Sequence, residues 1–274
     1  MKWNKAKSIL IVFFIIIDAL LLAYITADKL HSKKIEETIA DTAIEILSKH
    51  NISVDKKIIT KAAKSKSIKP VYAKNIIDDY TEFAKKIIGE NSKAESENIF
   101  SSDIGKITFD GDYFEAERAA SGALCGFAEN SDDYEKTALQ CLSAMGAQTS
   151  NLKGITNKNN KEASVSFKKR INGLEVFGAG MRFDFDGSGL KRISGNWYNE
   201  KESDDDLLEL KSPSGALIEY MNQRDNSSKT VISDICLGFA SLESKTYHES
   251  ILLTPVWGII EESGKEVYIN AREK

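Results

Sequence analysis

The sequence contains few of the residues and motifs that enzymes and metal proteins use. It has three histidines, and none of them lies at the spacing of a zinc site. The G-x-S-x-G and H-E-x-x-H motifs are absent, so nothing indicates a nucleophile elbow or a zinc protease. A dispersed Ser-His-Asp arrangement stays open, because its members need not be neighbours in sequence. We therefore expect a protein that is not an enzyme, with no catalytic residue and no cofactor.

Complete phosphate-binding and metal-binding loops are also missing. Gly178 and Gly180 form only part of a G-x-G-x-x-G motif, and no helix signal follows them. Residues 184–189 (DFDGSG) open like a calcium loop, but Gly195 stands where the last carboxylate ligand should be. Asp and Gly are common in hairpin turns, so the sequence favours a turn here over a metal site. The acidic run at residues 204–206 is likewise more typical of a solvated loop than of a cation site.

Cysteines are too few and too scattered for a redox or zinc motif. Cys125, Cys141 and Cys236 include no C-x-x-C pair. Because three is an odd number, at least one thiol stays free if these residues lie outside the cytoplasm. A bond between Cys125 and Cys141 is one alternative, and three small apolar core residues are the other, which the sequence favours.

Positive charge is in slight deficit. The chain has 37 basic and 41 acidic residues, which gives a formal net charge of −4. A nucleic-acid-binding protein needs a basic stripe, so we expect no nucleic-acid partner. The hydrophobic content of 42% is high enough for a folded core.

An apolar run at residues 9–25 is the most informative segment. It follows a short leader with Lys2, Lys5 and Lys7, and about 17–25 apolar residues are enough for a helix that crosses a bilayer. The run is longer than the core of a typical signal peptide, so a permanent anchor is favoured, and cleavage after Ala27 is the alternative. The basic leader favours a cytoplasmic N-terminus. We expect a single-pass protein of the cell membrane whose bulk is extracytoplasmic.

One carboxylate, that of Asp18, interrupts the apolar run. A charge at the middle of a bilayer is costly unless it is paired, protonated or turned towards another helix. One alternative is that Asp18 is a polar residue which the apolar helix tolerates and which has no function. We favour a role for Asp18 in helix–helix interaction, which makes it the candidate site residue of the chain.

Helix and strand signals alternate after the anchor. Apolar residues recur with a helical period, and Ser131 and Ser212 are suitable N-caps. Helices are expected at residues 32–49, 76–88, 131–145 and 212–223. Period-2 alternation and the turn signals Asp110-Gly111 and Asn172-Gly173 predict strands and hairpins, with a polar loop at 90–97. Strands are expected at residues 107–109, 113–116, 163–168, 174–185, 190–197, 231–240, 250–260 and 265–270.

This order of elements predicts an α+β fold. A transmembrane helix would be followed by two antiparallel sheet-plus-helix units, each with its helices on one face of a meander. We expect three parts: the leader and anchor at residues 1–27, a first extracytoplasmic domain at 28–128, and a second at 129–274. Trp197 and Trp257 lie in strand patterns and are expected in the core or in a groove.

Several short segments carry a family resemblance. They are the leader WNKAK at residues 3–7, KKRINGLEVFGAG at 168–180, ISGNW at 193–197, PVW at 255–257 and EVYINA at 266–271. The last four resemble the hairpin and closing strands of PepSY-like regulatory modules. Together with the leader and its apolar helix, they resemble the YycI proteins of the YycH/YycI family of two-component system regulators.

The resemblance implies two PepSY-like units outside the membrane and a regulatory function without catalytic residues. The implied partners are a WalK-type sensor histidine kinase, which controls cell-wall metabolism, and a YycH-like protein. Contact would run through transmembrane helices, which includes Asp18. One alternative is a PepSY-type extracytoplasmic inhibitor or chaperone of a secreted hydrolase, and another is an anchored cell-wall enzyme.

Overall fold

The chain folds into two compact units, each assembled from several segments. The computed structural model describes residues 3–62, 67–127, 133–150, 152–159, 162–201, 206–224, 228–241 and 250–273, without the side chains of 3–12, 16, 28, 29 and 32. Unit 1 comprises Met1–Lys66, Lys211–Cys236 and Ile259–Ile269. Unit 2 comprises Ser67–Leu210, Leu237–Gly258 and Asn270–Lys274. The segments of the two units alternate along the chain. The domain boundaries expected from the sequence, at 27/28 and 128/129, stay a prediction.

Unit 2 contains two copies of one arrangement, a helix followed by a four-stranded antiparallel meander. The first copy consists of α3 (Tyr80–Ile88), β4 (Lys93–Ser96), β5 (Ile99–Ser101), β6 (Gly105–Asp110) and β7 (Tyr113–Arg118). The second consists of α4 (Tyr134–Ala144), β8 (Ile155–Lys158), β9 (Ala163–Ile171), β10 (Leu174–Asp186) and β11 (Gly189–Asn196). The predicted mixed α+β class with a largely antiparallel sheet is therefore confirmed.

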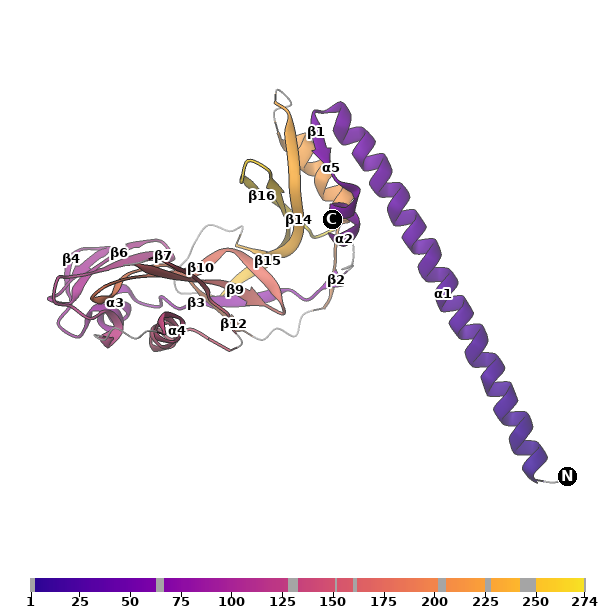
Figure 1. Cartoon of the computed structure of the whole chain (residues 1–274), viewed down its shortest axis with the longest axis horizontal. Helices are drawn as coiled ribbons and strands as arrows, with labels where there is room; N and C mark the ends of the chain where they lie inside the picture. Colours follow the sequence, from indigo (N-terminus) through magenta and orange to yellow (C-terminus); the bar gives the residue numbers. More distant parts are fainter. Residues whose placement is uncertain are drawn as a thin grey trace. The chain divides into compact units, whose positions relative to one another are not determined.

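The last strands of the two meanders join them into one sheet. β11 pairs with β7 in antiparallel register, with Ile193 opposite Ala116. The resulting order is β4-β5-β6-β7-β11-β10-β9-β8. Helices α3 and α4 both lie against the same face of this sheet (Figure 1).

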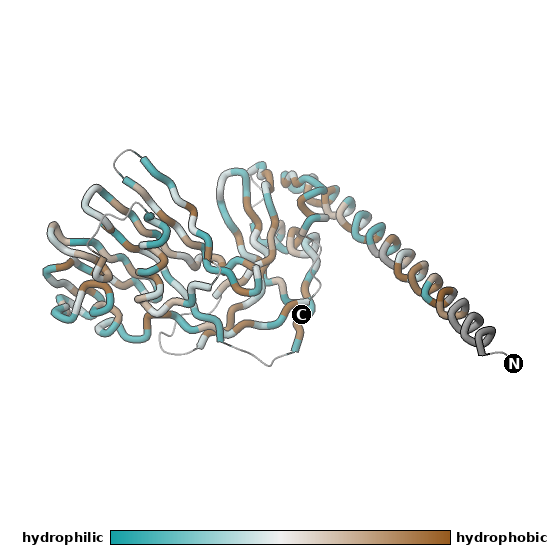
Figure 2. The backbone as a smooth tube through the Cα atoms, turned by 60° about the horizontal axis from the view of Figure 1, so that its bottom comes forward, coloured by the Kyte–Doolittle hydropathy of each residue, from teal (hydrophilic) through white to brown (hydrophobic). Residues whose placement is uncertain are grey.

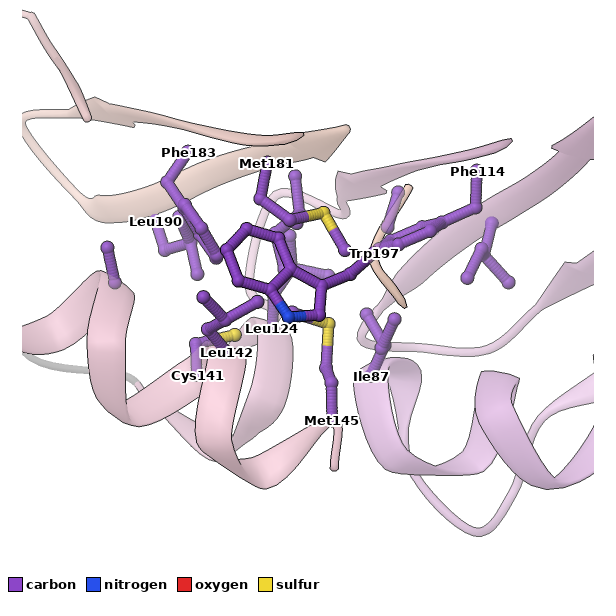
Figure 3. Packing of buried hydrophobic residues seen from close by; sticks show 14 of the residues in the cluster. Ile87, Phe114, Leu124, Cys141, Leu142, Met145, Met181, Phe183, Leu190 and Trp197 are labelled. Atoms are coloured by element: carbon purple, nitrogen blue, oxygen red, sulfur yellow. The ribbon is translucent and has the colours of Figure 1, made fainter. Parts of the chain in front are cut away.

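The core of unit 2 lies between this sheet and its two helices. Strand residues alternate between buried and exposed, as in β6, where Ile107 and Phe109 are buried and Lys106 is exposed. Figure 3 shows the indole of Trp197 between strand residues such as Met181 and helix residues such as Leu142. Trp197 and Trp257 are both fully buried, which confirms the core alternative for these two residues.

The turn signals of the sequence are confirmed at both hairpins. Asn172 and Gly173 both have positive φ, 53° and 80°, between β9 and β10. These are the values that a two-residue type I′ turn requires, so an Asn-Gly pair fits there. In the β6–β7 hairpin the positive φ of 66° falls on Gly111.

The incomplete glycine motif has a backbone role. Between Glu175 and Gly180 the register of β10 against β9 shifts, which marks a bulge. Gly178 lies in this bulge with φ 71°, and a Cβ added at Gly180 would come 2.7 Å from the Phe167 carbonyl oxygen. The two glycines thus permit the bulge and the close strand approach.

The rest of unit 2 is a smaller set of strands with its own core. β3 (Val71–Asn75) pairs in antiparallel fashion with β12 (Tyr198–Lys201) and with the Ile251–Leu253 part of β15 (Ile251–Glu261). The short strands β2 (Ser67–Ile68) and β13 (Leu208–Glu209) pair with each other. Ala73, Phe239 and Leu253 are fully buried in this second cluster.

Unit 1 is built around the C-terminal end of a 47-residue helix, α1 (Trp3–Lys49). This helix contacts β1 (Ile52–Val54), α2 (Lys56–Ala62) and α5 (Pro213–Gln223). β1 pairs in parallel with β14 (Thr230–Ala240), and β15 pairs with β16 (Glu266–Asn270). In Figure 2 apolar residues follow one another along the described N-terminal half of α1.

The predicted helices at residues 32–49 and 212–223 are confirmed, and two other predictions need correction. Helix α3 begins at Tyr80 instead of residue 76, because the Asp79 carboxylate caps it by accepting a hydrogen bond from the Glu82 amide at 2.9 Å. The expected loop at 90–97 contains β4, whose residues are all exposed and therefore show no apolar alternation. The predicted cap Ser131 lies outside the described residues, and Asp133 caps α4.

Replacing Gly195 by alanine should destabilise the fold strongly. Gly195 has φ 139°, and an added Cβ would lie 2.0 Å from the Gly180 carbonyl oxygen. We expect a loss of at least about 2 kcal/mol in the free energy of unfolding, measured by urea denaturation. The matched control is Gly187→Ala, whose Cβ meets nothing within 4 Å, and it should change stability by at most about 0.5 kcal/mol. Equal stability of the two variants would contradict the close approach of β10 and β11.

Candidate functional site

The N-terminal half of α1 exposes large apolar side chains on all sides. Those exposed by about half or more are Phe13, Phe14, Ile15, Leu20, Leu21, Leu22, Tyr24 and Ile25. Successive residues of an α-helix point about 100° apart, so three consecutive apolar residues cover more than half of the circumference. The set includes two such triplets. The exposed apolar surface therefore extends around the helix and is not confined to one face.

Asp18 lies on this part of α1 and is exposed. Its neighbours one helical turn away are Phe14, Ile15, Leu21 and Leu22. The sequence has no Lys or Arg between Lys7 and Lys29. Helix α1 itself therefore offers Asp18 no cationic partner, and a partner would have to come from another helix.

Among the described residues, no helix is long and apolar enough to cross a membrane. The expected anchor at residues 9–25 includes residues 9–12 and 16, whose side chains lie outside the description.

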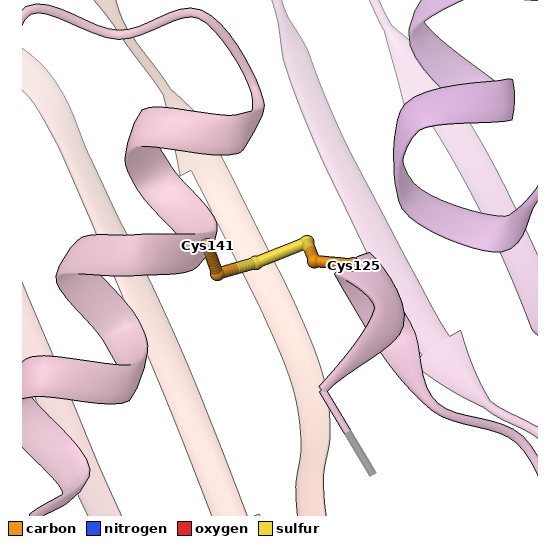
Figure 4. The surroundings of a disulfide bond; sticks show 2 residues. All are labelled: Cys125 and Cys141. Carbon is orange, nitrogen blue, oxygen red and sulfur yellow. A yellow bond between two sulfur atoms is a disulfide. The ribbon is translucent and has the colours of Figure 1, made fainter.

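Cys125 and Cys141 form a disulfide bond, the pairing that the sequence had left as the weaker alternative. It links η1 (Leu124–Gly126) to α4, with the two Cα atoms 5.7 Å apart (Figure 4). The bond closes a loop with a sequence separation of 16, for which the stabilisation is about 3 kcal/mol. Disulfides persist in oxidising compartments and are rare in a reducing cytoplasm. Cys236 is not part of a disulfide.

The segment that opens like a calcium loop is the β10–β11 turn, as the sequence favoured. Both Asp186 carboxylate oxygens accept hydrogen bonds from Arg118 Nη2, at 2.9 Å each. Arg118 Nη1 also donates to the Ser188 carbonyl oxygen at 2.6 Å. Because Arg118 is the last residue of β7, its contacts with the β10–β11 turn connect the two meanders.

The pKa of Asp186 reflects two opposing causes. Burial alone would raise it, but the Ser188 amide hydrogen bond and the Arg118 guanidinium together hold this pKa below its ordinary value of 3.8. The carboxylate therefore stays ionised and serves as a structural anion.

A second buried polar contact holds the β6–β7 turn. The Tyr198 hydroxyl donates to the Asp112 carboxylate, and Asn75 Nδ2 donates to the Asp112 carbonyl oxygen at 3.1 Å. Burial, followed by the contact with Asp112, raises the pKa of Tyr198 well above its ordinary value. Tyr80 adds a hydrogen bond to the Gly111 carbonyl oxygen. These contacts position the turn.

Lys169 is a buried cation that the sequence analysis did not single out. It is only 5% exposed, and its Nζ lies 5.3 Å from the centroid of the Trp197 ring. Burial lowers the pKa of Lys169, although Glu200 partly opposes this effect. Buried and exposed residues alternate along β9, and Lys169 occupies one of the buried positions, so the sequence did contain a signal for its burial. The cation–π contact with Trp197 makes Lys169 part of the core.

The outer face of the large sheet carries ion pairs and a shallow hollow of about 310 Å³. Arg182 pairs with Asp184 at 2.8 Å, and Arg192 pairs with Glu115 and Glu117. Of the acidic run at 204–206, only residue 206 lies within the described part of the chain.

No family model matches the sequence, and no curated protein matches it significantly. Solved structures of similar shape include an uncharacterized protein from Eubacterium rectale, with 13% identity over 74% of this chain and 81% of that one and a TM-score of 0.45. YycH from Bacillus subtilis has 13% identity and a TM-score of 0.43, and the match covers 74% of this chain and 51% of YycH. The C-terminal domain of Bacillus megaterium YpeB has 9% identity over 76% and 95%, with a TM-score of 0.29.

Replacing Arg118 by methionine should destabilise the protein in a pH-dependent way. The side chain of Arg118 is 10% exposed and that of Asp186 is 28% exposed, so a loss of about 2 kcal/mol is expected at pH 7. A lowered carboxyl pKa stabilises the fold above the unfolded-state pKa, and this contribution is lost as the pH falls through the folded-state pKa. The difference between wild type and variant should therefore shrink below about pH 4.

The matched control is Arg182→Met, which breaks an ion pair whose arginine is 58% exposed. Its effect should stay within about 0.5 kcal/mol. Urea denaturation across the pH range checks both variants. A loss for Arg118→Met that does not change with pH would show that Asp186 is not the group involved.

Proposed function

We propose that the chain is a membrane-anchored, non-enzymatic regulator of a WalK-type sensor histidine kinase that controls cell-wall metabolism. It acts through its transmembrane helix, together with a YycH-like partner. The proposal includes a cytoplasmic N-terminus, an extracytoplasmic bulk and a PepSY-like character for the two helix–meander copies. The resemblance of the leader and hairpin segments to the YycI proteins supports this assignment.

The observation that carries the proposal is the continuity of α1. The helix runs from Trp3 to Lys49 without a break, and the first 69 residues contain neither glycine nor proline. Its N-terminal half is the exposed apolar surface, and its C-terminal half contributes Ala40, Ala43 and Leu47 to the buried part of unit 1. A rotation or shift of the helix in the membrane is therefore passed to the folded unit without an intervening hinge.

Two further observations support the anchor and its orientation. A helix that is apolar on all sides is stable when lipid surrounds it, since its backbone groups are satisfied internally. The Cys125–Cys141 disulfide favours the oxidising side of a membrane for the folded units. The basic leader favours the opposite side for the N-terminus.

Regulation of a kinase requires unequal contact with its two signalling states. A helix that binds both states equally shifts nothing, however tightly it binds. Asp18 provides a directional contact, because a donor on a kinase helix meets the carboxylate at one rotation of that helix and not at another.

Replacing Asp18 by leucine should keep the protein in the membrane but weaken its association with the kinase. Loss of one interhelical hydrogen bond corresponds to roughly a 3- to 20-fold lower affinity. Co-purification of tagged full-length protein with its kinase from detergent-solubilised membranes checks this. Ala19→Leu, one residue away, is the matched control and should leave co-purification unchanged. Equal recovery of kinase with Asp18→Leu would count against a role for this carboxylate.

An inhibitor or chaperone of a secreted hydrolase is the second candidate, favoured by the polar hollow on the outer face of the sheet. Exchanging residues 1–27 for an unrelated transmembrane helix separates the two functions. Kinase regulation should be lost, read from a reporter of the kinase's target genes, while carbonate extraction shows the chimera still in the membrane. Retained regulation together with an effect on hydrolase activity would favour the second candidate.

A further inference from the structure

We propose that unit 1 binds a small molecule with a single carboxylate group, in a hollow beside the C-terminal end of α5 where Arg224 holds the carboxylate. The hollow has a volume of about 430 Å³, and α5, the start of β14 and the β15–β16 turn line it. All of its lining residues belong to unit 1. This binding site goes beyond the proposed function and does not depend on the kinase.

One carboxylate, that of Glu261, already lines the hollow, and groups of the same chain engage it. The Tyr220 hydroxyl donates to Glu261 Oε1 at 2.8 Å, and the Ser263 hydroxyl donates to Oε2 at 3.2 Å. Lys265 Nζ lies 3.8 Å from Oε1. Burial, followed by the contact with Glu261, raises the pKa of Tyr220 to about 12. The tyrosine therefore stays protonated near neutral pH and adds no second anion.

Arg224 brings a positive charge with which no carboxylate of the described residues pairs. Its Nη2 donates to the Ser228 carbonyl oxygen at 2.7 Å and to the Ser228 hydroxyl at 3.1 Å. Its Nη1 is buried and has no hydrogen-bond partner within the described part of the chain. A buried donor without an acceptor is costly, and native structures usually satisfy such groups. An acceptor bound in the hollow would complete the hydrogen bonding of this guanidinium.

The charges around the hollow favour a ligand group with one negative charge. Two cations, Arg224 and Lys265, and one anion, Glu261, line it, which leaves one positive charge in excess. The carbonyl groups at the C-terminal end of α5 disfavour a second negative charge at this place. A carboxylate fits, because a guanidinium can donate two parallel hydrogen bonds to its oxygens. A doubly charged phosphate would instead be repelled by Glu261.

The position of Arg224 at the end of a helix allows it to make this contact. It directly follows Gln223, the last residue of α5, and its side chain is half-buried. A change in its outer torsion angles therefore turns the guanidinium towards a ligand in the hollow without disturbing the core. Because α5 contacts α1, the bound ligand lies beside a helix against which the long helix packs.

Calorimetric titration of the full chain in detergent micelles tests the ligand class. The probe is N-acetyl-alanyl-alanine, whose only charge is its carboxylate, and the matched probe is the uncharged C-terminal amide of the same molecule. The acid should bind in the millimolar range, and the amide should bind at least about tenfold more weakly. Equal binding of acid and amide, no binding of either, or tighter binding of inorganic phosphate would overturn the proposal.

Two arginine variants test the place of binding. Arg224→Gln removes the guanidinium and should weaken binding of the acid by about 10- to 100-fold, as expected for the loss of hydrogen bonds to a charged group. Arg272→Gln makes the same chemical change at an exposed arginine that does not line the hollow, and it should bind the acid as the wild type does. The same affinity in both variants would show that Arg224 does not hold the carboxylate.

Lys265→Glu separates binding from a structural role of Arg224. The Lys265 side chain is 67% exposed, so its replacement should change the urea unfolding midpoint little. The variant turns the excess charge of the hollow from positive to negative and should weaken binding of the acid by about tenfold. Full affinity in this variant would place the carboxylate outside the hollow. The titrations contain no kinase, so a chain that binds no carboxylate would remove this site and leave the proposed function as it stands.

Discussion

The pairing of β7 with β11 is the contact on which the architecture of unit 2 depends. It joins two helix–meander copies that would otherwise each expose a long strand edge. The ion pair between Arg118 and Asp186 links β7 to the β10–β11 turn at the same junction. Because Gly195 has no side chain, β10 and β11 can approach closely. Because the two meanders form one sheet, α3 and α4 share one core around Trp197. The other face of the sheet carries charged side chains.

The sequence was informative wherever local chemistry decides the structure. The Asn172-Gly173 turn, the cap of α5 at Ser212 and the strands of the last third all follow from residues that are neighbours in the chain. β4 was missed because an edge strand with only exposed residues carries no alternation. The Cys125–Cys141 bond could not be chosen over its alternative, since pairing depends on how η1 lies against α4.

The candidate site was predictable in part. Asp18 and its apolar surroundings are visible in the sequence, but the partner of its carboxylate is not, because α1 offers none. The helical period at residues 32–49 predicted one packed face. In the structure Ala43 and Leu47 are covered while Ile35, Ile39 and Ile46 are not, a division that depends on where unit 1 places its other elements. Sequence periodicity reports how much apolar surface a helix has, and it does not report which part of that surface the same chain covers.

The interleaved construction of unit 1 has a consequence for biosynthesis. α1 is made first, yet one of the helices it contacts, α5, belongs to a segment that begins at Lys211, and the unit also needs strands that end near Ile269. Ribosomal synthesis is slow compared with helix formation, so the long helix exists well before α5 does. The contacts between α1 and α5 cannot form until most of the chain has been translated. Helix α1 is thus the first element to form, but it makes its last contacts only near the end of translation. A truncated product would retain the helix while lacking segments that cover it.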